Sequence, residues 1–143
     1  MSAESNKVLS RRLMEEAFNA GNIDVVDELV TTDVVTHDAA LPEPTIGPDA
    51  AKASIRGYRA AFPDLRITIE EQIADDQGVA TRWSAKGTQE GELMGMPATG
   101  KQATVTGITI DRIVDGRIAE SWTNWDTLGM LQQLGVVPAL ATA

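Results

Sequence analysis

The stretch "DRIVDGRIAESWTNWDTLGMLQQLG", residues 111–135, decides the fold class because it carries two periodicities in succession. Around the dipeptide Asp115-Gly116 it predicts a β-hairpin, since Asp-Gly readily adopts the left-handed conformations that tight hairpin turns require. The second arm of the hairpin ends at Asp126, and the apolar pattern that follows predicts a short helix. Antiparallel strands that run directly into a helix indicate an α+β chain.

The first third of the chain predicts three helices and a short strand. Near the N-terminus Leu9, Leu13 and Ala17 recur at the four-residue spacing of an amphipathic helix. A second short helix precedes a strand-like "VVTH" and a proline-bearing loop. Pro48 suits the first turn of a third helix, whose buried stripe is expected at Ala51, Ile55, Tyr58 and Phe62.

From residue 65 onward the hydrophobic period changes to two, which predicts long strands over residues 65–73, 79–88, 102–114 and 117–126. An irregular stretch rich in glycine lies between the second and third of them. The prediction is therefore a single domain, residues 1–143, in which a curved antiparallel sheet wraps around three N-terminal helices and a short C-terminal helix closes the chain.

Composition narrows the functional classes. The 143 residues include one His and no Cys, so neither a structural zinc site nor an iron–sulfur cluster is expected. A net charge of −9 disfavours nucleic acid and anionic membrane as partners. The sequence lacks the glycine patterns of nucleotide-binding loops, a secretory signal and an apolar run of the roughly 20 residues that span a bilayer. We expect a cytoplasmic protein without metal or cofactor.

Three segments carry a resemblance to a known family. They are "YRAAFPDLRITIE" (58–70), "TRWSAKGTQEGELMGMPATGK" (81–101) and the opening stretch, and together they resemble the SnoaL-like polyketide cyclases of the nuclear transport factor two-like superfamily. The resemblance implies the alpha+beta cone fold and a homodimer or higher oligomer. It also implies a cofactor-independent enzyme in which an Asp at the end of the last strand is the general acid/base of an intramolecular aldol ring closure. Asp126 is the matching position.

Two interpretations of Asp126 remain open. As the residue before a helix it can cap backbone N–H groups, a contribution of about 1 kcal/mol. As a pocket residue among Trp83, Trp122 and Trp125 it would have a raised pKa, which suits a group that takes and returns a proton near neutral pH.

Other polar candidates lie near Asp126 or at the expected pocket mouth. Glu120 shares the strand face of Asp126 but is separated from it by roughly 20 Å, which excludes a carboxylate dyad. Asn124 is closer and could donate to a substrate carbonyl, or be satisfied within the strand. His37 is the second catalytic candidate, because the resemblance implies a His at the pocket mouth, although a lone His is commonly solvated or structural.

The expected ligand is an apolar, carbonyl-bearing small molecule, because the aromatic side chains fall in segments that should face the interior of the cone. The predicted substrate-binding residues could equally be ordinary core or loop residues. They are Tyr58, Phe62, Trp83, Met94, Met96, Trp122 and Asn124.

The same fold leaves other functions open. An isomerase or dehydratase would use the same proton chemistry, and an epoxide hydrolase would need an Asp-Arg-Asp arrangement. Arg82 is on a neighbouring strand but should point away from the pocket, since it alternates with Trp83. In a noncatalytic binding or dimerisation domain Asp126 would be only a helix cap.

Overall fold

The computed structural model describes residues 2–138, so the ends of the predicted domain, residues 1 and 139–143, lie outside the described residues. The helices are α1 (Ala3–Arg12), α2 (Val26–Leu29), α3 (Pro48–Ala61) and α4 (Thr127–Gln133), and a π-helical segment, Leu13–Asn19, continues α1. The strands are β1 (Val30–Asp38), β2 (Thr45–Ile46), β3 (Arg66–Ala74), β4 (Gly78–Thr88), β5 (Gln102–Val114) and β6 (Arg117–Trp125).

These elements confirm the α+β class, with one difference in the sheet. The strand order is β2-β1-β6-β5-β4-β3, and β3 to β6 form the predicted antiparallel meander. β1, however, pairs with β6 in parallel, so the sheet is mixed. β1 also begins four residues before the expected "VVTH", since α2 ends at Leu29 and the chain is extended from Val30.

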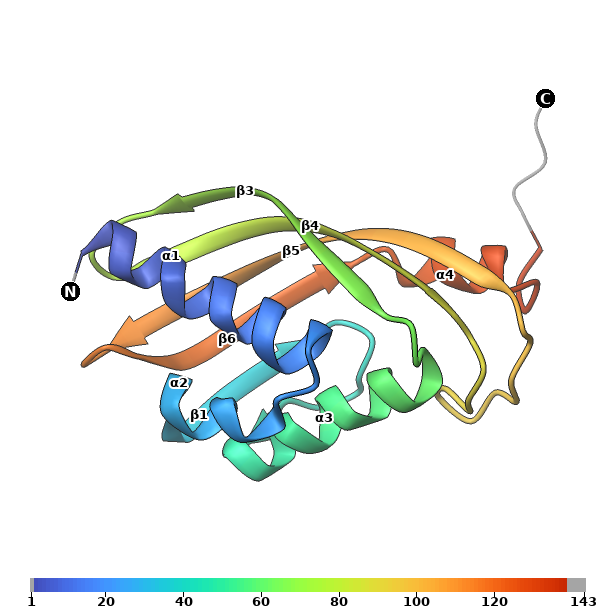
Figure 1. Cartoon of the computed structure of the whole chain (residues 1–143), viewed down its shortest axis with the longest axis horizontal. Helices are drawn as coiled ribbons and strands as arrows, with labels where there is room; N and C mark the ends of the chain where they lie inside the picture. The colour runs from blue at the N-terminus through green and yellow to red at the C-terminus, as the bar shows by residue number, and fades with distance from the viewer. Residues whose placement is uncertain (1, 139–143) are drawn as a thin grey trace.

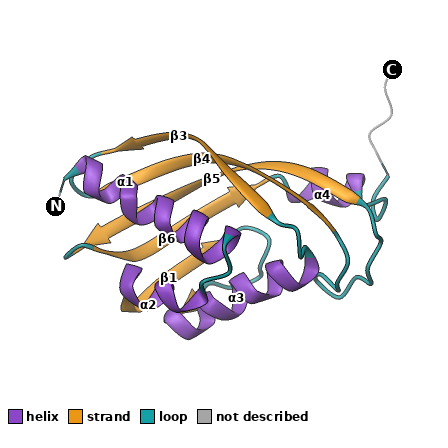
Figure 2. Cartoon of the chain, in the orientation of Figure 1, coloured by secondary structure: helices purple, strands orange, loops and turns teal. Residues whose placement is uncertain are grey.

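The helices cover one face of the curved sheet. Figure 1 shows α1 and α3 on the same side of β3 to β6, with α4 at the end of the sheet from which β6 emerges, and Figure 2 shows the layers by type. Pro48 opens α3, as predicted, and Phe62 follows its last residue. The sheet face that the helices cover is the inner face, and the opposite one the outer face.

The buried side of α1 is more polar than the sequence pattern predicts. Its fully buried residues are Asn6 and Ser10, whereas Leu9 and Leu13 are only partly buried against the core. The Asn6 side chain donates to the carbonyl of Asp75 in the β3–β4 turn (2.9 Å), which fastens the start of α1 to the sheet. A helix that buries polar groups must find partners for them, so these residues tie α1 to specific strands.

The hairpin turn between β5 and β6 forms as predicted. Asp115 and Gly116 both have positive φ, 50° and 77°, as the mirror-image turns of two-residue hairpins require. The register shifts between Arg112 and Ile113, opposite Ala119 of β6. This bulge lets Ile118 and Ser121 both be buried, although they are three residues apart.

None of the helices within residues 2–138 is long and apolar enough to cross a membrane.

Gly107 makes room for the Trp83 side chain on the inner face. It pairs with Trp83 across β4 and β5, and a Cβ at this position would overlap the Trp83 indole. We predict that Gly107→Ala lowers the free energy of unfolding by about 1–3 kcal/mol through overpacking. Gly57 in α3 is the matched control, because no heavy atom lies within 4 Å of an added Cβ. Gly57→Ala should stabilise the chain by roughly 0.4–1 kcal/mol. Urea unfolding measures both, and equal effects would contradict the packing argument.

Candidate active site

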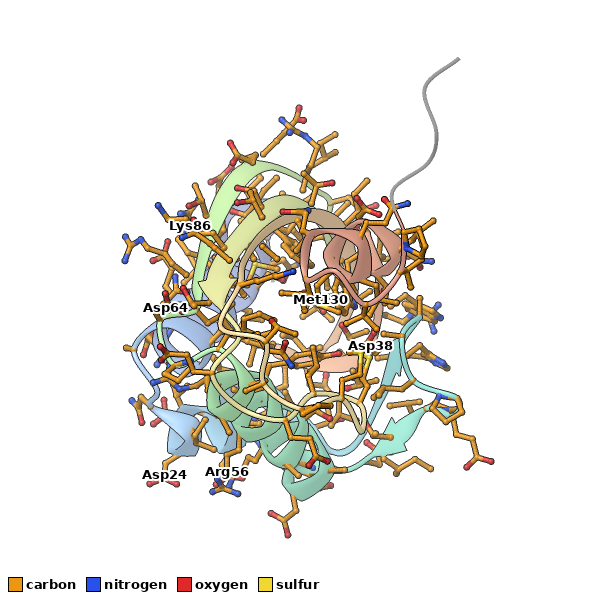
Figure 3. All side chains as sticks on the ribbon, turned by 90° about the vertical axis from the view of Figure 1, so that its right-hand side faces the viewer. Asp24, Asp38, Arg56, Asp64, Lys86 and Met130 are labelled. Carbon is orange, nitrogen blue, oxygen red and sulfur yellow. The ribbon has the colours of Figure 1, made fainter. Side chains whose placement is uncertain are left out.

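A cavity of about 180 Å³ lies between the inner face of the sheet and the covering helices. Its walls are mainly apolar, and Tyr58, Phe62 and Trp83 are among the residues that line it. Figure 3 looks at the end of the molecule where α4 lies, and in this view the labels of Met130 and Asp38 lie close together near the centre of the molecule. The cavity therefore has the apolar walls and few polar groups typical of small-molecule sites.

The polar groups of the cavity follow from the register of the central strands. Asp38 of β1 is paired with Thr123 of β6, and Thr123 is paired with Thr109 of β5. Paired residues project from the same face, so the three side chains form one row across the cavity floor, and all three line the cavity. The next row contains Ser121 and Asp111, which are also paired and also line it.

Asp38 is held by three hydrogen-bond donors. Its Oδ1 accepts from the backbone N–H of Ala40 (2.9 Å) and from Nε1 of Trp125 (3.0 Å). Its Oδ2 accepts from the hydroxyl of Tyr58 (2.7 Å). The bond to Ala40 is the local turn that Asp forms with the backbone two residues on, and it fixes the carboxylate at the end of β1. Donors from the loop, β6 and α3 thus set its orientation.

Tyr58 is fixed in its role as a donor. Burial raises the pKa of the Tyr58 hydroxyl, and the hydrogen bond to Asp38 raises this pKa further, since both disfavour the phenolate. The ring also meets Trp125 edge-on, with centroids 6.1 Å apart. The two aromatic side chains therefore brace each other and the carboxylate that they share.

The Thr109–Thr123 pair has a hydrogen to spare. Nε1 of Trp83 donates to Oγ1 of Thr109 (3.0 Å), because an indole nitrogen can only donate. The two threonine hydroxyls are 2.9 Å apart and share one further hydrogen bond. Two hydroxyls own two hydrogens, so one hydrogen is left that these contacts do not use, and it is available to an oxygen in the cavity.

Asp111 is the second carboxyl group of the cavity and is 1% exposed. The Ser10 hydroxyl of α1 donates to its Oδ2 (2.5 Å), and Ser121 is its pairing partner on β6. Burial raises the pKa of Asp111, against the smaller opposing effect of the two serine hydroxyls. Its Oδ1 is buried and has no hydrogen-bond partner.

The structure does not bring Asp126 to the cavity. Asp126 is exposed and is the N-cap of α4, where its Oδ1 accepts from the backbone N–H of Gly129 (2.9 Å). A Cβ at Gly129 would overlap this carboxylate, so the glycine makes room for the cap. The prediction that tryptophans enclose Asp126 does not hold, because β6 ends at Trp125 and the side chain of Asp126, the next residue, is exposed.

His37 and Trp122 lie together on the outer face of the sheet. Their rings stack 5.3 Å apart, and Nε2 of His37 is 2.8 Å from Oε2 of Glu120. Arg112 lies over the Trp122 ring and also contacts Glu120. Since Ser121, Thr123 and Trp125 face the cavity, strand alternation sends the even-numbered residues of β6, including the exposed Asn124, to the opposite side.

The remaining predicted residues divide between the cavity and a loop. Met94 and Met96 lie in the β4–β5 connection, where Met94 is 43% exposed and Met96 packs partly buried against Leu93 and its neighbours. Neither lines the cavity. Tyr58, Phe62 and Trp83 are thus the predicted substrate-binding residues that the structure does bring together.

The cavity lining also bears on the alternative functions. Within the described chain it contains no arginine, and Arg82 instead contacts Glu71 at the surface. An Asp-Arg-Asp arrangement of the epoxide hydrolase type therefore does not form there. No cluster of three metal-ligating side chains occurs among residues 2–138.

Comparison with known proteins identifies the family of this chain. The sequence profile described as SnoaL-like polyketide cyclase matches residues 8–134. The chain belongs to this family.

Two curated cyclases are similar to the chain over most of its length. The aklanonic acid methyl ester cyclase of Streptomyces peucetius is 34% identical over 127 residues, which cover 87% of each protein. The nogalonic acid methyl ester cyclase of Streptomyces nogalater is 32% identical over 124 residues, or 85% of this chain and 92% of the relative. A solved structure assigned as a SnoaL-like polyketide cyclase, from Jannaschia sp. CCS1, shares the fold with a TM-score of 0.87, at 23% identity and 95% coverage of both chains.

Sequence reasoning about this SnoaL-like chain missed Asp38, Asp111, Thr109 and Thr123. Asp38 precedes "AALPEP", whose prolines predict a loop, although in an extended segment Val34, Thr36 and Asp38 would share one face. Asp111 and Thr109 alternate with exposed isoleucines, so the hydrophobic pattern points to the wrong face of β5.

We predict that Asp111 makes stability depend on pH. Below about pH 4 the Asp111 carboxyl group is protonated in both the folded and the unfolded chain. At higher pH it ionises in the unfolded chain first, which lowers the free energy of the unfolded state. The contribution of Asp111 to stability therefore falls as pH rises, by about 1.4 kcal/mol per pH unit, until the raised pKa is reached. Asp111→Asn cannot ionise. The unfolding free energy of this variant minus that of the parent, from urea titrations at pH 4 to 8, should increase with pH, and a flat or falling difference would contradict the raised pKa.

Proposed function

We propose that this SnoaL-like protein closes a ring in a polyketide-derived methyl ester by an intramolecular aldol reaction, with Asp38 as the general acid/base. The two curated relatives are cyclases of polyketide methyl esters, which supports the substrate class. The observation that carries the residue assignment is the position of Asp38, a carboxylate in the cavity whose orientation three donors set.

Asp38 has the capacity to accept one more hydrogen. The two oxygens of a carboxylate offer about four acceptor positions. Oδ1 uses two of them, on Ala40 and Trp125, and Oδ2 uses one, on Tyr58. The remaining position is on Oδ2, and a general base must have such an open position within reach of the proton that it removes.

The reaction needs no group beyond those in the cavity. Asp38 removes a proton from the carbon next to the ester carbonyl, which leaves an enolate. The enolate carbon attacks a ketone carbon of the same molecule, so that one C–C bond forms and the ketone oxygen becomes an alkoxide. The protonated Asp38 then returns the proton to that alkoxide. Product and substrate are isomers, and the carboxylate is regenerated.

The Thr109–Thr123 pair supplies the donor for the enolate oxygen. Thr123 is the immediate neighbour of Asp38 in the sheet, and the pair has one hydrogen that its own contacts do not use. A positioned donor at the oxygen where negative charge develops lowers the barrier to enolisation. The apolar walls around Tyr58, Phe62 and Trp83 strengthen this contact, because electrostatic interactions are stronger in surroundings of low polarity.

Asp126 remains the competing assignment from the family resemblance. Its position as an exposed helix cap favours a contribution to stability of about 1 kcal/mol. A noncatalytic binding role is the second candidate function, and the same cavity geometry would serve it without any proton transfer. Matched Asp→Asn variants separate these possibilities, since Asn keeps the shape and loses the base.

We predict that Asp38→Asn lowers kcat for aklanonic or nogalonic acid methyl ester about 10²- to 10⁴-fold, the usual contribution of a general base. Asp126→Asn should retain kcat within about twofold, because Asn is nearly as good an N-cap as Asp. Cyclisation is followed by chromatographic separation of substrate and product, which are isomers of the same mass. Binding of the unreacted ester is measured in parallel.

The outcomes assign the residue and test the function separately. Loss of turnover in the Asp126 variant alone would move the acid/base role to Asp126. Binding of both esters without turnover by the parent protein would support the binding role and refute the cyclase proposal.

We also propose that two copies pair through the outer face of the sheet. Ile73, Ile108 and Ile110 lie on that face and are 68%, 49% and 50% exposed, so pairing would remove a run of apolar surface from water. Ile110→Lys should then shift the mass in sedimentation equilibrium toward the monomer. Val8→Lys is the control, since Val8 is 51% exposed on α1. A parent that sediments as a monomer would refute the pairing.

A further inference from the structure

The cavity contains a second polar cluster that the proposed reaction does not use. Ser10, Asp111 and Ser121 come from α1, β5 and β6, and all three line the cavity. Asp111 is two strands away from Asp38 and its row is offset by two residues along β6, since Asp38 pairs with Thr123 and Asp111 with Ser121. These offsets put the Cα atoms of the two acids roughly 12 Å apart.

The cluster has an unfilled hydrogen-bonding position. Oδ1 of Asp111 is buried and without a partner, although more than nine in ten buried polar groups in proteins have one. The residue itself is 1% exposed, so bulk water does not satisfy this atom. An unpartnered carboxyl oxygen in a group that lines a cavity indicates that a ligand atom completes it.

The count of hydrogens decides what kind of ligand atom this is. Ser10, Ser121 and a protonated Asp111 together own three hydroxyl hydrogens. Ser10 donates one of them to Oδ2 of Asp111, and a contact between Ser121 and the carboxyl group can use at most one more. At least one hydrogen is therefore left, and an ionised Asp111 would itself offer only acceptors.

The surroundings favour the protonated form. The facing side chain from α1 is Ser10, the one from β6 is Ser121, and the residue paired with Asp111 on β4 is Val79. None of them carries a charge, so no ion pair offsets the cost of burying a carboxylate. The neutral cluster is therefore a donor.

We propose that Ser10, Asp111 and Ser121 form a second ligand subsite that donates a hydrogen bond to a carbonyl oxygen remote from the reacting carbons. Within the proposed function, on which this detail of the substrate rests, the ligand is a fused-ring polyketide with one carbonyl beside Asp38 and Thr123 and another at Asp111. The subsite fixes which end of a nearly flat molecule enters first. Binding at Asp111 itself requires no turnover, so it can be tested apart from catalysis.

The test compares 1-tetralone with tetralin, two bicyclic molecules that differ in one carbonyl group. Dissociation constants come from NMR titrations of the full-length protein, and the quantity measured is the preference for the ketone, Kd(tetralin)/Kd(1-tetralone). Asp111→Leu should lower this preference about tenfold, as loss of a buried hydrogen bond predicts. Asp111→Asn keeps an N–H donor and should retain the preference within about threefold. Thr123→Val is the control for the other end of the cavity.

Each outcome supports or overturns the subsite. A preference that survives Asp111→Leu but is lost in Thr123→Val would overturn it, because the ketone then binds beside Asp38. Equal loss in the Leu and Asn variants would refute a donor role. The absence of any ketone preference in the parent would also refute it.

The protonation state has a separate readout. The carbon-13 resonance of the Asp111 carboxyl group, assigned by its absence from Asp111→Asn, should have the shift of a protonated carboxyl at pH 7. A resonance at the position of an ionised carboxylate would overturn the proposal even if the cyclase assignment stands. Conversely, a ketone preference that depends on Asp111 in a protein without turnover would leave the subsite intact and refute only the cyclase assignment.

Discussion

The parallel pairing of β1 with β6 is the constraint on which the candidate site depends. Its register sets Asp38 beside Thr123, inside the cavity, and His37 beside Trp122, on the outer face. Because side chains alternate along a strand, a slip of one residue would exchange the two and leave an imidazole where the carboxylate now lies. The hydrogen bonds from Tyr58 and Trp125 to Asp38 favour the observed register, since both donors reach the carboxylate only from the cavity side.

Local sequence signals predicted most of the fold because the forces behind them act over short distances. The Asp115-Gly116 turn is predictable because only a few residues tolerate its positive φ values. The start of α3 at Pro48 is predictable because the first turn of a helix does not need the N–H group that proline lacks. The period of two placed β3 to β6 to within a residue or two at each end. The parallel neighbour of β6 was not predictable in this way, since residues 30–38 and 118–123 are far apart in sequence and no short-range pattern links them.

The sequence did not predict which side chains of β5 and β6 face the cavity, and the reason is specific. In β5 the isoleucines at 108 and 110 are exposed, whereas Thr109 and Asp111 are buried, so the usual hydrophobic pattern is inverted there and returns to normal at Ile113. In β6 both faces carry a tryptophan, Trp122 outside and Trp125 inside, and aromatic content cannot decide between them. Asp126 follows from the family resemblance and Asn124 from its proximity to Asp126 on an ideal strand, whereas the inverted pattern of β5 hid the row that contains Thr109. Local inversions of this kind are expected where function competes with folding.

The two aspartates of the cavity have different hydrogen-bond partners. Asp38 is contacted by an indole N–H and a backbone N–H, which can only donate, and by a phenol that its raised pKa keeps protonated. Asp111 is contacted by serine hydroxyls, which can donate or accept, and its own carboxyl is more deeply buried. Asp38 is thus surrounded by fixed donors, whereas burial raises the pKa of Asp111 among hydroxyls that can reorient. In the proposed binding mode, a molecule with two carbonyl groups meets Asp38 as proton acceptor at one end and Asp111 as hydrogen-bond donor at the other, which orients it before any bond changes.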